Sequence, residues 1–202
     1  MLDTYIRPYI NPPLEKTAKI LARSRVTANQ LTVFGFMLWL GAFACLAFNL
    51  YIPALTLILL NLLIDGLDGP LSRLTSPNGS DLGAFLDSVA DFIFYGGIVF
   101  FFALGRPETS LHAAFLIFSF MGTASSFLTY AILATKSGLN HERQGKKSFY
   151  YLSGLTEGTE TTFFFVLICL FPVYFSLMAI IFGIMCWLTT AGRIWQAIKT
   201  FS

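Results

Sequence analysis

The stretch LIDGLDGPLSRLTSPNGSDLGAFLDSVAD, residues 63–91, holds five of the chain's 11 acidic residues and lies between two long apolar runs. Asp65 and Asp68 are three residues apart, and Asp87 and Asp91 are four apart, so each pair falls on one face of a helix. A charged side chain at the centre of a membrane helix costs about 2.5–3.5 kcal/mol, so four unpaired carboxylates would cost ~10–14 kcal/mol. The stretch therefore predicts two helices whose carboxylates share a compensating partner.

The rest of the chain has the composition of a polytopic membrane protein. Of its 202 residues, 55% are hydrophobic and 12% are charged, and the mean hydropathy is +0.69. The net charge of +2 is too small to indicate nucleic-acid binding. Apolar runs long enough to span a membrane lie at about residues 31–49, 52–68, 82–104 and 111–134, with two more inside 161–195, broken near Pro172. We therefore expect an all-α integral membrane protein with six transmembrane helices.

The N-terminal segment predicts a helix that lies in the membrane interface. Residues 13–24 alternate apolar and charged positions in the manner of an amphipathic helix. The apolar positions are Leu14, Ala18, Ile20 and Leu21, and the charged ones are Glu15, Lys16, Lys19 and Arg23. We expect one domain over residues 1–202, with 1–30 as a cytoplasmic and interfacial segment and 31–202 as the six-helix body.

The distribution of lysine and arginine predicts the orientation. If the N-terminus is cytoplasmic and there are six spans, 12 of the 13 basic residues fall on the cytoplasmic side and only Arg106 falls on the other. Cytoplasmic loops of membrane proteins carry such an excess. We therefore expect both termini, and the aspartate-rich stretch, at the cytoplasmic face.

The compensating partner of the four carboxylates is predicted to be metal. Arg73 is the only basic residue in the stretch, and one guanidinium cannot neutralise four carboxylates. Oxygen ligands without histidine or thiolate favour Mg²⁺, Mn²⁺ or Ca²⁺, and two such ions suit displacement at a phosphorus atom. Asp81 is set apart as a predicted helix cap. A cation or proton pathway is the competing interpretation, because intramembrane carboxylates also serve transport.

The spacing of the motif resembles the signature of the CDP-alcohol phosphotransferases, D-x2-D-G-x2-A-R, a spacer, then G-x3-D-x3-D. Seven of its eight fixed positions are met, by Asp65, Asp68, Gly69, Arg73, Gly83, Asp87 and Asp91. The departure is Ser72, where the family usually has alanine. Members of this family are six-helix membrane enzymes with an interfacial N-terminal helix, and TANQLTVFG, residues 27–35, is similar to the segment that opens their first span.

The resemblance implies a role for each matching residue. Asp65, Asp68 and Asp87 would hold two Mg²⁺ or Mn²⁺ ions, and Asp91 would complete the metal cluster and act as the base on the acceptor hydroxyl. In addition, Gly69 and Gly83 would allow close approach of the CDP moiety, and Arg73 would pair with the diphosphate. The resemblance also implies a homodimer.

The function implied is phospholipid synthesis at a bacterial inner membrane. A phosphatidyl group would pass from CDP-diacylglycerol to the hydroxyl of a small polar alcohol, with release of CMP to the cytoplasm. Within the family, the alternative is a CDP-linked small alcohol as donor and a lipid as acceptor. Outside it, the alternative is a cation transporter.

The acceptor site is expected near the start of the fifth span. Glu157 and Glu160 would repel a phosphate there, which favours a neutral polyol or an amine-bearing acceptor. Alternatively, both carboxylates only complement a helix dipole, with Thr156 or Thr159 as the cap. A basic cluster at residues 141–148 offers either phosphate contacts or contacts with anionic lipid.

Overall fold

A computed structural model describes residues 3–23, 28–75, 81–137 and 155–201, and these ranges contain helices and turns but no strand. The expected all-α fold is therefore confirmed. The helices are α1 (Asp3–Arg23), α2 (Ala28–Ala47), α3 (Tyr51–Thr75), α4 (Asp81–Gly105), α5 (Ser110–Lys136), α6 (Gly158–Leu170) and α7 (Phe175–Phe201), with 3-10 turns η1 (Pro107–Thr109) and η3 (Pro172–Tyr174).

Four of the described helical segments are long and apolar enough to cross a membrane. They are Tyr51–Leu71, Ser88–Gly105, Pro107–Lys136 and Pro172–Phe201. Val33–Ala47 in α2 and the whole of α6 are apolar but shorter. The 13 residues of α6 rise only about 20 Å at 1.5 Å per residue, less than the ~30 Å of a hydrocarbon core. The chain is an integral membrane protein, and α6 is the shortest of its described α-helices.

Helix α3 is longer than the sequence predicts. The second apolar run was expected to end near Asp68, but α3 continues to Thr75 through Pro70. Proline has no N–H, so the carbonyl of Gly66 lacks its donor four residues on. Relative to alanine, Gly66, Gly69 and Pro70 together lower the intrinsic helix propensity by about 5 kcal/mol. Tertiary packing must therefore hold this part of α3 in helical form.

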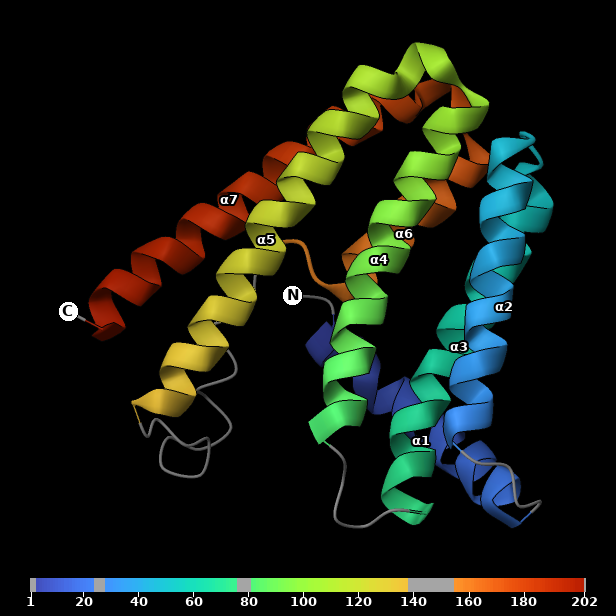
Figure 1. Cartoon of the computed structure of the whole chain (residues 1–202), viewed down its shortest axis with the longest axis vertical. Coiled ribbons are helices and arrows are strands. Elements are labelled where there is room, and N and C mark those ends of the chain that lie inside the picture. The colour runs from blue at the N-terminus through green and yellow to red at the C-terminus, as the bar shows by residue number, and fades with distance from the viewer. Residues whose placement is uncertain (1–2, 24–27, 76–80, 138–154, 202) are drawn as a thin grey trace.

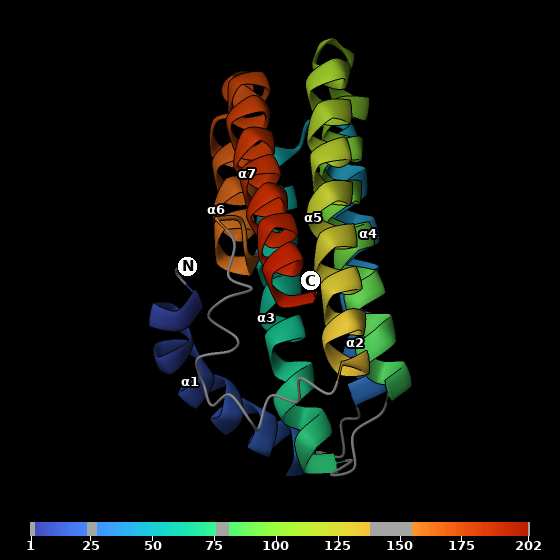
Figure 2. The ribbon, with the colours of Figure 1, turned by 90° about the vertical axis from the view of Figure 1, so that its left-hand side faces the viewer.

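The helices are arranged as two groups, α1 to α3 and α5 with α7, and α4 packs against both groups (Figure 1). Helix α2 packs against both α3 and α4, and α5 packs against both α4 and α7. Figure 2 shows α1 lying across the lower end of the molecule, next to α3, which is its main packing partner. The predicted apolar stripe of α1 is divided: Ala18 is fully buried, whereas Ile20 is 64% exposed.

The upper end of the molecule in Figure 1 is closed by hydrogen bonds between three turns. Asn49 Nδ2 donates to the Gly105 carbonyl at 3.0 Å, and Arg106 Nη1 donates to the Pro172 carbonyl at 2.7 Å. A Cβ on Gly105 would lie 2.5 Å from the Leu46 carbonyl oxygen, so only glycine permits this approach of α4 to α2. Arg106, the one basic residue expected at this face, is thus used to join turns.

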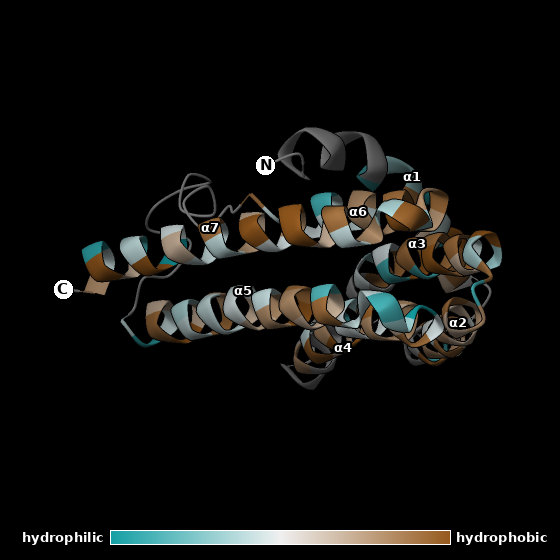
Figure 3. Cartoon of the chain, turned by 90° about the horizontal axis from the view of Figure 1, so that it is seen from above, coloured by the Kyte–Doolittle hydropathy of each residue, from teal (hydrophilic) through white to brown (hydrophobic). Residues whose placement is uncertain are grey.

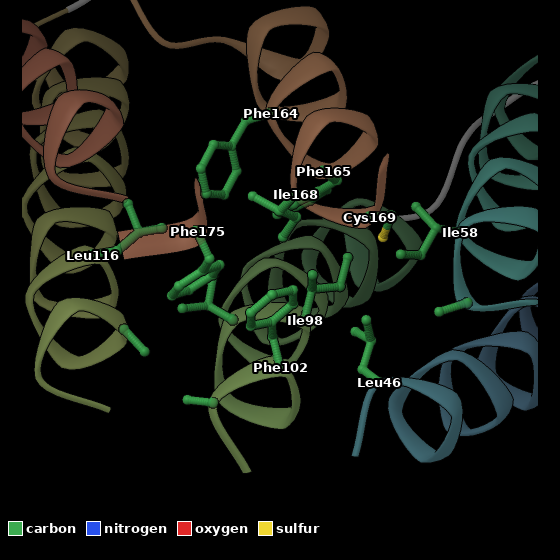
Figure 4. Packing of buried hydrophobic residues seen from close by; sticks show 14 of the residues in the cluster. Leu46, Ile58, Ile98, Phe102, Leu116, Phe164, Phe165, Ile168, Cys169 and Phe175 are labelled. Atoms are coloured by element: carbon green, nitrogen blue, oxygen red, sulfur yellow. The ribbon is translucent and has the colours of Figure 1, made fainter. Parts of the chain in front are cut away.

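Helix α6 lies in the middle of the apolar core (Figure 4). Its residue Phe164 stacks on Phe182 of α7 with ring centroids 4.7 Å apart, and Phe102 of α4 stacks on Phe175 at 4.1 Å. Further buried side chains around it are Leu46, Ile58, Ile98, Leu116, Phe165, Ile168 and Cys169. Helix α6 thus packs against α7 on one side and, on the other, against α3.

Helices α5 and α7 run side by side, with more hydrophilic residues toward the C-terminal end of α7 (Figure 3). Two glycines allow them to come close. A Cβ on Gly122 would lie 3.2 Å from Thr190 Oγ1, and one on Gly183 would lie 2.5 Å from the Phe115 ring. This close pair forms one wall of the pocket described below.

We predict that Arg106→Met lowers the free energy of unfolding by about 1.5–3 kcal/mol, because a partly buried, charged hydrogen bond between two turns is lost. The check is the thermal unfolding midpoint in detergent micelles. Glu108→Gln is the control: Glu108 pairs with Arg106 at 2.8 Å, but its side chain is 60% exposed, so a loss within about 1 kcal/mol is expected. Equal effects of both changes would contradict the assigned role of Arg106.

Candidate functional site

The first half of the acidic motif lies in the last four turns of α3. Asp65 is exposed and Gly69 is half-buried. Asp68 and Arg73 belong to the same helix, but their side chains lie outside the part that the structure describes. Because α3 remains helical to Thr75, the three-residue spacing does place Asp65 and Asp68 on one face.

The second half lies in the first three turns of α4. Gly83 and Asp87 belong to this helix, and the structure describes only their backbone. Asp91 is half-buried. Tyr95 follows it by one helical turn, so Asp87, Asp91 and Tyr95 form a row on α4.

Helix α2 sets the spacing between these two halves. Helices α3 and α4 share few direct contacts over the described residues, whereas each packs against α2. Trp39 of α2 stacks on Phe94 of α4 at 5.0 Å, and Gly35 of α2 approaches Asn61 of α3. The carboxylates of the motif are therefore carried by two helices that a third helix holds together.

The donor set of the motif fits a hard divalent cation. Its four side chains offer only carboxylate oxygens, which Mg²⁺ and Mn²⁺ accept. The thiols of Cys169 and Cys186 are buried in the core. Among the described side chains, which do not include those of Asp68 and Asp87, no three His, Cys, Asp or Glu residues are grouped as metal ligands.

A cavity of about 270 Å³ is lined on α4 by Phe92, Tyr95 and Gly96, which follow Asp91 in the sequence. It lies between α4, α5, the start of α6 and α7. Its polar lining consists of Tyr95, Thr123, Thr156, Glu157, Thr161 and Arg193, and its apolar lining includes Phe92, Ile117, Phe120, Met121 and Phe127. The size and the mixed lining suit a small polar molecule.

Arg193 is the cation of this cavity. Its Nη1 donates to the Thr123 carbonyl at 2.9 Å, and its guanidinium lies 5.4 Å from the centroid of the Phe127 ring. The Nε atom is buried and has no hydrogen-bond partner among the described residues. From the sequence, Arg193 contributes only to the predicted orientation; its one local signal is that it is a single arginine inside the apolar stretch LTTAGRIW, residues 188–195.

Glu157 and Glu160 form the start of α6. Glu157 is the N-cap residue, and its N–H donates to Glu160 Oε2 at 3.2 Å as part of a capping box. The prediction of Thr156 or Thr159 as the cap is wrong, because the Thr156 hydroxyl donates to Thr189 of α7 instead, at 3.1 Å. Glu157 also lines the cavity, whereas Glu160 does not.

Thr189 anchors the chain that leads into α6. Its hydroxyl oxygen accepts a hydrogen bond from the Leu155 N–H at 3.0 Å and itself donates to the Met185 carbonyl. The segment before Glu157 is thereby fixed to α7. The basic cluster at residues 141–148, the other predicted source of acceptor contacts, lies outside the described residues.

Fold and site together define a class: a polytopic helical membrane protein with an acidic motif on two helices and a polar cavity beside it. Comparison with known proteins agrees. The sequence matches the CDP-alcohol phosphatidyltransferase family over residues 25–195. The chain therefore belongs to this family, whose members transfer a phosphatidyl group from a CDP-alcohol to an acceptor.

Three relatives illustrate the range of the family. Inner membrane protein YnjF of Escherichia coli (strain K12) is 46% identical over 201 residues, which cover 99% of this chain and 97% of the relative. Archaetidylinositol phosphate synthase of Pyrococcus horikoshii is 39% identical over 100 residues, 50% of this chain and 53% of that protein. A protein of Aquifex aeolicus is 31% identical over 163 residues, 79% of this chain and 76% of the relative.

Proposed function

We propose that the protein moves the phosphatidyl group of CDP-diacylglycerol to the hydroxyl of a small polar alcohol and releases CMP. The observation that supports this most is the polar cavity, whose lining on α4 starts at Phe92, directly after Asp91, the proposed base. A donor held at the motif and an alcohol held in the cavity would meet at this residue. The whole chain, residues 1–202, would act as one catalytic domain, as a homodimer in the membrane.

The proposed topology has six crossings, α2 to α7, with both termini and the motif at the cytoplasmic face of a bacterial inner membrane. In support, Figure 1 shows that α3 and α4 carry the motif at their ends away from the turn that contains Arg106. The C-terminal ends of α5 and α7 also point away from this turn. The Escherichia coli relative carries the name of an inner membrane protein. In this topology α1 would lie at the cytoplasmic surface.

Two divalent cations, Mg²⁺ or Mn²⁺, are proposed to bind Asp65, Asp68, Asp87 and Asp91. Bound there, they would neutralise the diphosphate and favour the ionised form of the attacking hydroxyl.

The proposed reaction is a displacement at phosphorus. Asp91 takes the proton of the acceptor hydroxyl, whose oxygen forms a bond to the phosphorus that carries diacylglycerol. The bond from this phosphorus to the bridging oxygen breaks, and the electron pair and the oxygen leave with CMP. Arg73 offsets charge on the diphosphate, while Gly69 and Gly83 let the nucleotide approach the backbone.

The acceptor is proposed to occupy the cavity between Glu157 and Arg193. One carboxylate and one guanidinium line this space, so it offers both charges to a ligand. This combination favours a neutral polyol, an amine-bearing alcohol or a zwitterionic alcohol over an acceptor with a phosphate group. Glu160 would contribute indirectly, because its side chain caps the helix that presents Glu157.

We predict that Asp91→Asn lowers CMP release at least 100-fold, because an amide cannot take the hydroxyl proton. The measurement is CMP release from radiolabelled CDP-diacylglycerol by purified protein in micelles with saturating Mg²⁺. Asp81→Asn is the matched control on the same helix and should stay within threefold of wild type.

Wild-type turnover by Asp91→Asn would show that Asp91 is not the base. Two further measurements distinguish the alternative functions. Release of CMP only from a CDP-linked small alcohol with diacylglycerol would support the reverse choice of donor and acceptor. Cation flux in proteoliposomes without CMP release from any donor would support a transporter.

A panel of acceptors tests the proposed cavity. We expect glycerol, inositol, ethanolamine and serine, as a group, to include a better substrate than glycerol phosphate or inositol phosphate. For an amine-bearing substrate, Glu157→Gln should raise the KM of the acceptor about tenfold and leave that of CDP-diacylglycerol unchanged, because one charged hydrogen bond is lost. Glu160→Gln, which keeps a capping oxygen, is the control. A clear preference for a phosphorylated acceptor would contradict the proposal.

A further inference from the structure

The weak segment of α3 coincides with the first half of the acidic motif. Gly66 lies between Asp65 and Asp68 in sequence, and Pro70 removes the backbone donor that would normally pair with the Gly66 carbonyl. Glycine adds backbone freedom at the same place. Some other part of the protein must keep this turn helical if the two carboxylates are to stay on one face.

Helix α1 makes a direct contact with α3 at this turn. A Cβ on Gly66 would lie 3.1 Å from Leu14 Cδ1 and 3.7 Å from Leu14 Cδ2, so the leucine side chain rests on the bare glycine backbone. One turn further along α1, Ala18 is fully buried. Since α3 is the main packing partner of α1, the apolar side of α1 covers the weak segment.

The opposite side of α1 is polar. Glu15, Lys16 and Lys19 are exposed, and the Thr17 hydroxyl is bonded to the Pro13 carbonyl of its own helix at 2.9 Å. The described part of α1 therefore has a side chain packed on α3 at the motif and a hydrated face away from it. This arrangement differs from that of a helix whose whole apolar stripe faces lipid.

We propose that α1 stabilises the helical conformation of the metal-binding turn of α3, with Leu14 as a positioning residue that acts through Gly66 on Asp65 and Asp68. The inference rests on the proposed metal-binding role of these aspartates. It adds a function for the N-terminal helix: with Leu14 in place the turn stays helical, and without it the turn frays and the aspartates lose their common face.

Amide hydrogen exchange of the metal-free protein tests whether α1 stabilises this turn, and it does so without a measurement of turnover. In Leu14→Ala we expect the amides of residues 66–71, other than Pro70, which has no N–H, to exchange at least tenfold faster than in wild type, with little change at residues 52–60 of the same helix. Adding Gly66→Ala should restore slow exchange, because alanine raises the helix propensity of the weak turn and fills the space that Leu14 left.

Binding of Mn²⁺, followed by the electron paramagnetic resonance signal of the free ion, tests the effect on the aspartates. We expect Leu14→Ala to weaken Mn²⁺ binding about tenfold and the double variant with Gly66→Ala to come within threefold of wild type. A purely structural contact would lower stability without this pattern of loss and rescue.

The chain offers a matched control for the same geometry away from the motif. A Cβ on Gly41 of α2 would also lie 3.1 Å from a leucine Cδ1, that of Leu57. Leu57→Ala should lower the unfolding midpoint but leave exchange at residues 66–71 as in wild type, because Leu57 does not contact the weak turn of α3 at Gly66.

Unchanged exchange at residues 66–71 in Leu14→Ala would overturn the proposal. Faster exchange with unchanged Mn²⁺ affinity would also overturn it, since α1 would then brace the fold without positioning the aspartates. Failure of the proposed function would appear separately, as wild-type protein that binds Mn²⁺ and releases no CMP.

Discussion

The arrangement of the site depends on the packing of α2 between α3 and α4. The two helices that carry the acidic motif hardly contact each other over the described residues, and each instead rests on α2. Gly35 and Gly41 bring α2 close to α3, while Trp39 and the Phe43 ring, which occupies the space beside Gly97, set its distance from α4. Small residues on one side and aromatic ones on the other thus hold the two halves of the motif apart by a fixed amount.

The molecule is closed at one end and carries the acidic motif at the other. Hydrogen bonds from Asn49 and Arg106 join three turns at the upper end, and stacked aromatic rings around α6 fill the middle. At the lower end, α3 contains residues that weaken a helix, and α6 begins part of the way down, next to the cavity. Stability concentrated away from the motif allows the irregular elements that substrate binding would use.

Much of the fold and of the acidic motif was predictable from the sequence, because the length of an apolar run and the spacing of charged residues are local properties of the chain. The runs of apolar residues gave the helices, and the spacing of Asp65, Asp68, Asp87 and Asp91 assigned them to two helix faces. What the sequence did not reveal depends on tertiary contacts. Pro70 does not end α3, because packing outweighs its local penalty. Arg193 was counted only among the cytoplasmic basic residues, since only the approach of α5 to α7 places it in a cavity. Glu157 caps α6 because Thr156 is bonded to α7.

We propose above that the aspartates of α3 and α4 bind metal ions together. The most direct measurement is an experimental structure of the protein with Mn²⁺ and a non-hydrolysable CDP-diacylglycerol analogue, with manganese located by its anomalous scattering. We predict two manganese peaks about 3.5–4 Å apart between α3 and α4, with carboxylate oxygens of both helices as ligands. Manganese bound to the aspartates of one helix alone, or no manganese beside the diphosphate, would contradict the account.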